Sequence, residues 1–187
     1  SEFVSVLDVN QSYPADFNED NFNKLLIDVL LKIGDRKKAY DIINSLQIDE
    51  KNEHNIFYKE FLINYLLSTY NLNESCSLRN EIKDLNIENQ SNFFLKVDIF
   101  CLVLQERFDE ANLLNSLLIE SGEIDKYFQL LFEKLQNPEL ATEIIYKDAV
   151  DNNIFLYSAM HRIGNIPLNS KFLESDPINL SMPIILS

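Results

Sequence analysis

Histidine and cysteine, two residue types that often carry catalysis or bind metals, are scarce in this sequence. Its 187 residues include two histidines, His54 and His161, and two cysteines, Cys76 and Cys101. The sequence has no Cys-x-x-Cys, His-x-x-x-His or glycine-rich phosphate loop, so the spacings that bind zinc or a nucleotide are missing. We therefore expect no enzyme activity, no cofactor and no metal site.

Each of these four side chains also has an ordinary structural interpretation. His54 stands at an expected helix start, where a solvated or capping role is common, and His161 falls on an expected terminal helix. Two scattered cysteines are more typical of small buried apolar residues than of a disulfide, although Cys76 and Cys101 would pair in an oxidising compartment. We expect them to be unpaired.

The composition indicates a folded all-α protein with an acidic surface. Hydrophobic residues make up 46% of the chain, which is enough for one sizeable core, and only 3 Gly and 5 Pro favour helices over turn-rich β folds. With 30 acidic and 16 basic residues the formal net charge is −14, which argues against nucleic-acid partners. No apolar run is long enough to span a membrane, so we expect no membrane contact.

Apolar residues recur at helical spacing in three blocks, residues 20–46, 53–85 and 92–122. Each block predicts two helices joined by a short turn, and a small residue, Ala39, Ser75 or Ala111, stands near the start of the second helix at intervals of 36 residues. Four aliphatic columns keep the same interval: Ile27, Ile63 and Ile99; Leu30, Leu66 and Leu102; Ile42, Leu78 and Leu114; Leu46, Ile82 and Leu118. A helical hairpin cannot bury its apolar face alone, so we expect a right-handed stack of antiparallel helical hairpins.

The remaining segments are expected to flank this stack. We assign residues 1–19 to an extended acidic lead-in, 20–122 to the three hairpins, 123–165 to C-terminal capping helices and 166–187 to a proline-containing tail. Gly34 supplies the left-handed turn of the first hairpin, and we expect an asparagine to replace it in the second. The apolar end of the sequence and its start without Met suggest that the natural chain is longer.

The 36-residue spacing resembles the tetratricopeptide repeat (TPR), in which a glycine and a small residue stand five apart, as Gly34 and Ala39 do. The resemblance covers residues 20–122 and implies a TPR-like α-solenoid. This chain departs from the family at Ile27, Ile63 and Ile99, where TPRs prefer a small residue.

A second resemblance is to uncharacterised alphaproteobacterial helical proteins, some of which carry the label "antifreeze". The residues that carry it are Phe100-Cys101-Leu102, Glu110-Ala111, Leu117-Leu118, Gly122, Asp125 to Leu131, Ile163-Gly164 and Pro167. That group has no assigned activity. The resemblance implies a bacterial protein and leaves its compartment, cytoplasm or periplasm, open.

In a TPR-like stack the first helix of each hairpin lines a concave groove, so the resemblance implies a binding site. Carrying the groove positions over gives this candidate set: Lys24, Asp28, Phe57, Glu60, Asn64, Phe93, Lys96 and Phe100. If exposed, Phe57, Phe93 and Phe100 would form an apolar strip that anchors a peptide or an amphipathic helix of another protein. If buried, the same rings would be core.

We therefore expect an interaction adapter or scaffold. The alternative is a structural or self-associating module, a homo-oligomer or part of a larger protein, whose groove is filled by its own flanking segments.

Overall fold

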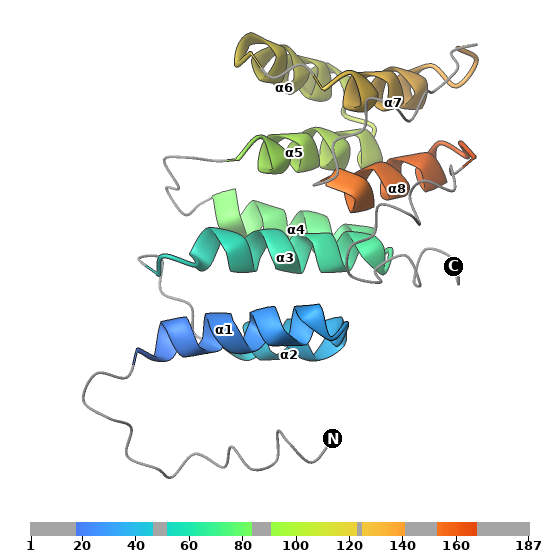
Figure 1. Cartoon of the computed structure of the whole chain (residues 1–187). Helices are drawn as coiled ribbons and strands as arrows, with labels where there is room; N and C mark the ends of the chain where they lie inside the picture. The colour runs from blue at the N-terminus through green and yellow to red at the C-terminus, as the bar shows by residue number, and fades with distance from the viewer. Residues whose placement is uncertain (1–17, 47–51, 84–90, 123–124, 141–152, 168–187) are drawn as a thin grey trace.

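The computed structural model describes residues 18–46, 52–83, 91–122, 125–140 and 153–167. Within these ranges the secondary structure is helical, with no strand, which confirms the all-α prediction (Figure 1). The helices are α1 Glu19–Lys32, α2 Arg36–Ser45, α3 Asn55–Ser68, α4 Leu72–Lys83, α5 Asn92–Leu104, α6 Phe108–Glu120, α7 Lys126–Gln136 and α8 Ile154–Ile163. None of these described helices has the length and apolar character needed to cross a membrane. The expected lead-in up to residue 17, the tail from residue 168 and an expected helix over 141–152 lie outside the described residues.

The turns inside the first three helix pairs have the same geometry every 36 residues. One residue in each turn has a left-handed backbone: Gly34 with φ of 82°, Tyr70 with φ of 61° and Glu106 with φ of 58°. The amide of the next residue then donates to a carbonyl of the first helix, at 2.9 Å in every case: Asp35 to Leu30, Asn71 to Leu66 and Arg107 to Leu102. Backbone hydrogen bonds thus fix where each second helix begins.

The second turn differs from the sequence-based prediction, which placed an asparagine in the left-handed position. Tyr70 takes that position instead. Asn71 stands one residue later, and its backbone amide closes the turn. The Asn71 side chain donates to the Thr69 hydroxyl at 3.1 Å. The Tyr70 ring stacks under the Arg162 guanidinium of α8, which lies 3.7 Å from the ring centroid.

The small-residue column lies in the core. Ala39, Ser75 and Ala111 are each 0% exposed, and so are the three isoleucines of the first helices. A side chain without bulk at these positions lets two helices approach closely. Apolar side chains form one cluster around α1, α2 and α3 and a larger cluster that extends from α3 to α8.

Successive hairpins meet at one repeated pair of positions. Tyr40 of α2 stacks on Tyr65 of α3, with ring centroids 4.2 Å apart. The same pair of positions, 36 residues later, holds Cys76 of α4 and Cys101 of α5, which form a disulfide with a Cα–Cα distance of 5.7 Å. The expectation of unpaired cysteines is therefore wrong, because the register that brings two tyrosines together at one junction brings the two thiols together at the next.

A buried ion pair lies beside the disulfide, between the same two helices. Arg79 stands one turn after Cys76 and donates to Asp98, one turn before Cys101, at 2.8 Å. The Arg79 guanidinium also lies over the Phe94 ring and donates to the backbone carbonyl of Phe94. Since both charged groups are at most 5% exposed, the pair fixes the register of α4 against α5.

Helix α8 is a central element of the fold. Its residues from Ile154 to His161 are all buried, and it packs against α3 and α7 and lies beside α5 (Figure 1). A helix that is apolar on every side needs neighbours on every side. Capping alone, as expected for residues 123–165, does not describe α8.

Candidate protein-binding site

The structure divides the eight candidate groove residues into two groups. Six are partly exposed on α1, α3 and the start of α5: Lys24, Asp28, Phe57, Glu60, Asn64 and Phe93. The other two, Lys96 and Phe100 of α5, are 1% and 0% exposed. The prediction that Lys96 and Phe100 lie in an open groove is therefore wrong.

Helices α7 and α8 account for the burial of these two side chains. Phe100 belongs to the same apolar cluster as Tyr157 and Met160 of α8. The Lys96 ammonium pairs at 2.8 Å with Asp125, the residue that caps the start of α7. The 36-residue alignment predicts which face of α5 these residues occupy, but it cannot predict that a helix much later in the chain covers that face.

Asp125 is the centre of a buried polar network. One carboxylate oxygen accepts from the Phe128 amide at 3.0 Å, and the other accepts from the Lys96 ammonium and from the Tyr157 hydroxyl. Because Asp125 is 3% exposed and Lys96 is 1% exposed, the charges neutralise each other out of contact with water. Their contacts hold α5, α7 and α8 together.

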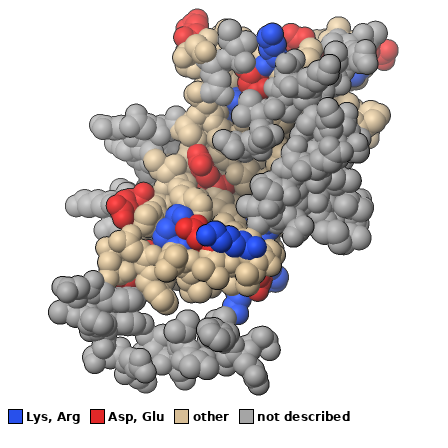
Figure 2. Space-filling view, viewed as in Figure 1, with Lys and Arg blue, Asp and Glu red and all other residues tan. Residues whose placement is uncertain are grey.

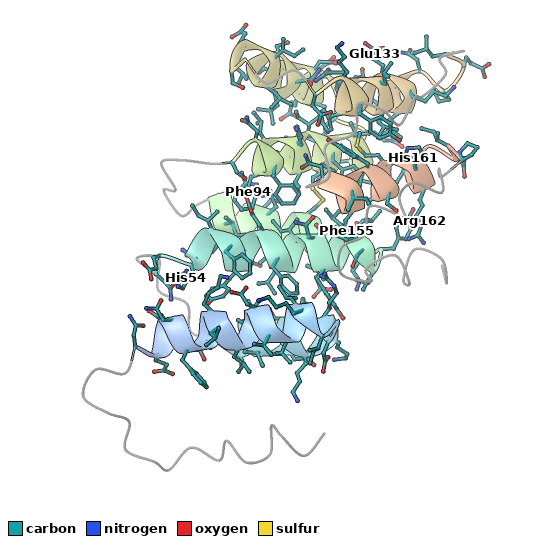
Figure 3. The ribbon with its side chains drawn as sticks, viewed as in Figure 1. His54, Phe94, Glu133, Phe155, His161 and Arg162 are labelled. Atoms are coloured by element: carbon teal, nitrogen blue, oxygen red, sulfur yellow. A yellow bond between two sulfur atoms is a disulfide. The ribbon has the colours of Figure 1, made fainter. Side chains whose placement is uncertain are left out.

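His161 continues the network on α8 (Figure 3). Its Nδ1 lies 3.3 and 3.1 Å from the carbonyls of Ile166 and Pro167, which can only accept, so Nδ1 carries the hydrogen. Its Nε2 then accepts from the Tyr127 hydroxyl at 2.6 Å. Burial lowers the pKa of His161 and outweighs the opposite effect of the two carbonyls, so the imidazole is neutral.

These residue types could perform acid–base chemistry, but here they bond to one another inside the core. The sequence-based reasoning missed the network, although Asp125 at a helix start was a visible signal for one of its members. Among the residues that the structure describes, no group of three or more His, Cys, Asp or Glu could hold a metal ion. The other histidine, His54, makes no capping hydrogen bond and instead contacts Asn21 of α1 at 3.1 Å.

The open part of the candidate site lies on α1 and α3. The Lys24 ammonium pairs with Asp28 at 2.7 Å and stands 4.0 Å from the centre of the Phe57 ring. Glu60 accepts a hydrogen bond from the Ser91 hydroxyl at 2.5 Å. Figure 2 shows basic and acidic side chains together on this face, where α1 lies. Mixed charge around a partly exposed ring is typical of the edge of a protein interface.

A cavity of about 380 Å³ opens beside this face, where α1 begins, α2 ends and α3 begins. The residues that line it are Glu19, Asp20, Asn23, Ser45, Leu46, Asn52 and Tyr58. Tyr58 is 1% exposed, and its buried hydroxyl has no hydrogen-bond partner among the residues that the structure describes. Burial, with smaller contributions from Asp20 and Asp28, raises the pKa of Tyr58 to about 12, so the hydroxyl stays neutral. The cavity therefore combines two carboxylates with amide and hydroxyl groups.

Comparisons with known proteins give no relatives for this chain: no family model, no curated protein and no solved structure matches it. The resemblance to TPRs accordingly remains a prediction based on the residues themselves.

Proposed function

We propose that this chain is a TPR-like helical-repeat protein, a right-handed stack of antiparallel hairpins, that acts as a non-catalytic interaction adapter or scaffold. Its partner is a peptide or helix of another protein. The partner binds the face formed by Lys24 and Asp28 of α1 and by Phe57 and Glu60 of α3, here called the α1–α3 face. The recurrence of the same turn, small buried residue and junction every 36 residues supports the repeat architecture. Repeat architectures expose extended faces that suit macromolecular partners.

The observation that carries the proposal is the acidic cavity beside Phe57. A buried hydroxyl that lacks a hydrogen-bond partner among the described residues costs stability unless a ligand bonds to it, and the exposed carboxylates of Glu19 and Asp20 beside it would attract a cationic ligand. A lysine or arginine side chain would pair with Glu19 and Asp20 and donate to the Tyr58 oxygen. The Phe57 ring, 5.6 Å from the Tyr58 ring, would contact the apolar neighbours of that basic residue.

The charge of the whole chain favours the same partner. A net charge of −14 attracts cationic segments and repels nucleic acid and anionic membrane surfaces. The proposed partner is therefore a protein segment with a basic residue beside apolar ones.

A structural or self-associating module is the second candidate function, and α8 is the observation in its favour. The two α5 residues of the candidate groove, Lys96 and Phe100, are already buried by other parts of the same chain. In that case a flanking segment of the same chain would also fill the α1–α3 face.

Selection of short random peptides displayed on phage, with the full chain as bait, tests the first candidate. We expect enriched peptides to carry Lys or Arg next to apolar residues, and their affinity, measured by fluorescence anisotropy, to fall at least about tenfold in the double variant Glu19→Gln, Asp20→Asn. Glu120→Gln, an exposed carboxylate on α6, is the matched control. Failure to enrich any basic peptide, or equal loss in the control, would refute the proposal.

A further inference from the structure

The outward side of α1 is apolar and exposed. Leu25, Val29 and Ile33 stand one turn apart along the helix and are 62%, 47% and 69% exposed. Leu26, which is partly exposed, lies between Leu25 and Val29 on the same side and also packs against the apolar cluster of α1, α2 and α3. These four residues, here called the α1 seam, form a strip along the second half of the helix.

The positions equivalent to the seam are packing surfaces in the next two hairpins. Adding 36 residues to Leu25 and Val29 gives Phe61 and Tyr65 of α3. Phe61 is 8% exposed, and Tyr65 stacks on Tyr40 of the preceding hairpin. On this side α3 receives the second helix of the hairpin before it.

The third hairpin repeats the arrangement. The equivalent residues on α5 are Val97, which is 0% exposed, and Cys101, which is bonded to Cys76 of the preceding hairpin. Two junctions thus show that this side of a first helix is built to receive another helix. On α1 the same side receives no helix from the described part of the chain.

We propose that the α1 seam is a dimer interface between two copies of this chain, with their α1 helices antiparallel around a two-fold axis at Val29. This axis places Leu25 of one copy against Ile33 of the other and Val29 against its equivalent. At the two internal junctions this side of a first helix receives the second helix of the preceding hairpin, whereas in the dimer it receives α1 of the other copy.

The charges at the two ends of α1 complement each other in this arrangement. Its first turn carries Glu19 and Asp20, its last turn carries Lys32, and Lys37 and Lys38 follow at the start of α2. An antiparallel pair brings the acidic end of each helix to the basic end of the other and also opposes the helix dipoles. A parallel pair would place like charges together.

The expected dimer is weak, and it should persist when salt is added. One helix pair buries less than the roughly 1,600 Å² of a standard interface, so we expect a dissociation constant on the order of 10–100 µM. Salt screens both the repulsion between two copies of net charge −14 and the attraction between their helix ends, while apolar burial remains, so the dimer should persist as salt is added. None of the seam residues lines the acidic cavity, but Glu19 and Asp20 contribute to both sites, so Glu19→Gln, Asp20→Asn should weaken both and Val29→Asp should weaken the dimer alone.

Sedimentation velocity of the full chain over a range of concentrations tests the dimer. We expect the mass to rise from monomer to dimer and the Val29→Asp variant to weaken association at least about tenfold. Leu113→Asp on α6, where Leu113 is 64% exposed, is the matched control and should dimerise normally. Ile33→Glu is a second seam variant should Val29→Asp lose its helical circular-dichroism signal.

Disulfide cross-linking gives an independent geometric test. Val29→Cys should form a covalent dimer under mild oxidation, because the two positions meet at the axis, and Leu113→Cys should not. A monomer at every concentration, or a dimer that survives both seam variants, would overturn the proposal. A dimer that forms only after deletion of residues 1–17 would also overturn it, since that segment would then cover the seam in the full chain.

Discussion

Glu106 offers a sharp test of the repeated hairpin turn. It has a φ of 58° at the position where the first hairpin has Gly34 with a φ of 82°. A residue with a Cβ pays about 1–2 kcal/mol in the left-handed region, whereas glycine loses about 0.5–1 kcal/mol more chain entropy on folding. Because the Glu106 side chain is exposed, Glu106→Gly should raise the free energy of unfolding by about 0.5–1 kcal/mol.

The same position in the other two hairpins supplies internal controls. Gly34→Ala should lower the free energy of unfolding by about 1 kcal/mol, because it introduces the strain that Glu106→Gly removes. Tyr70→Gly should gain less than Glu106→Gly, since it also removes the contact between the Tyr70 ring and Arg162, which is worth about 0.5–1 kcal/mol.

Urea denaturation followed by circular dichroism measures all three variants. A change of 1 kcal/mol corresponds to a shift of about 2–4 °C in the melting temperature of a chain of this size. Loss of stability in Glu106→Gly, or an unchanged midpoint in Gly34→Ala, would refute the assigned turn geometry.

Three further predictions concern the core. Ala39→Leu and Ala111→Leu should each lower the free energy of unfolding by about 1–3 kcal/mol by overpacking sites that are 0% exposed; unchanged melting temperatures in both would refute the role of the small-residue column. The double variant Cys76→Ser, Cys101→Ser should lower it by about 2–4 kcal/mol, since it opens a cross-link with a sequence separation of 25; melting curves that do not respond to the variant or to reductant would contradict the disulfide. The lowered pKa of His161 implies stability that is present above its ordinary pKa of 6.5 and lost as pH falls below it; urea titrations from pH 8 to about 5 should show this loss, and His161→Gln should flatten it.

Local order could be predicted from the sequence because it depends on neighbouring residues. The period of apolar residues indicates the helices of the three hairpins, and Gly34 marks the first turn. The 36-residue columns indicate Ala39, Ser75 and Ala111 as equivalent positions, and all three are buried. The left-handed Tyr70 and Glu106 follow from that register, even though their residue types do not suggest it.

Contacts between distant segments could not be predicted in the same way. Lys96 looks like a surface residue until it pairs in the core with Asp125, which also accepts from Tyr157, and Phe100 looks like a binding anchor until it joins the apolar cluster that includes residues of α8. The disulfide could be predicted only in part. Cys76 and Cys101 occupy the positions of Tyr40 and Tyr65 one repeat later, but this relation becomes visible only when one junction is known in three dimensions.

The cavity could not be predicted from the sequence either. Its walls come from the start of α1, the end of α2 and the start of α3, and no local pattern reports that these ends converge. The unpartnered hydroxyl of Tyr58 depends on that convergence as well. An aromatic residue in an apolar helix pattern is otherwise typical core.

Amide chemical-shift mapping by NMR tests the central claim most directly. The full chain is titrated with a basic peptide obtained by phage selection, with a twin peptide in which Gln replaces the basic residue as the control. The account predicts shifts that cluster around Glu19 to Lys24, Ser45 and Leu46, and Asn52 to Tyr58, and that disappear with the twin peptide. Shifts that cluster on α6, α7 or α8, or that are the same for both peptides, would contradict it.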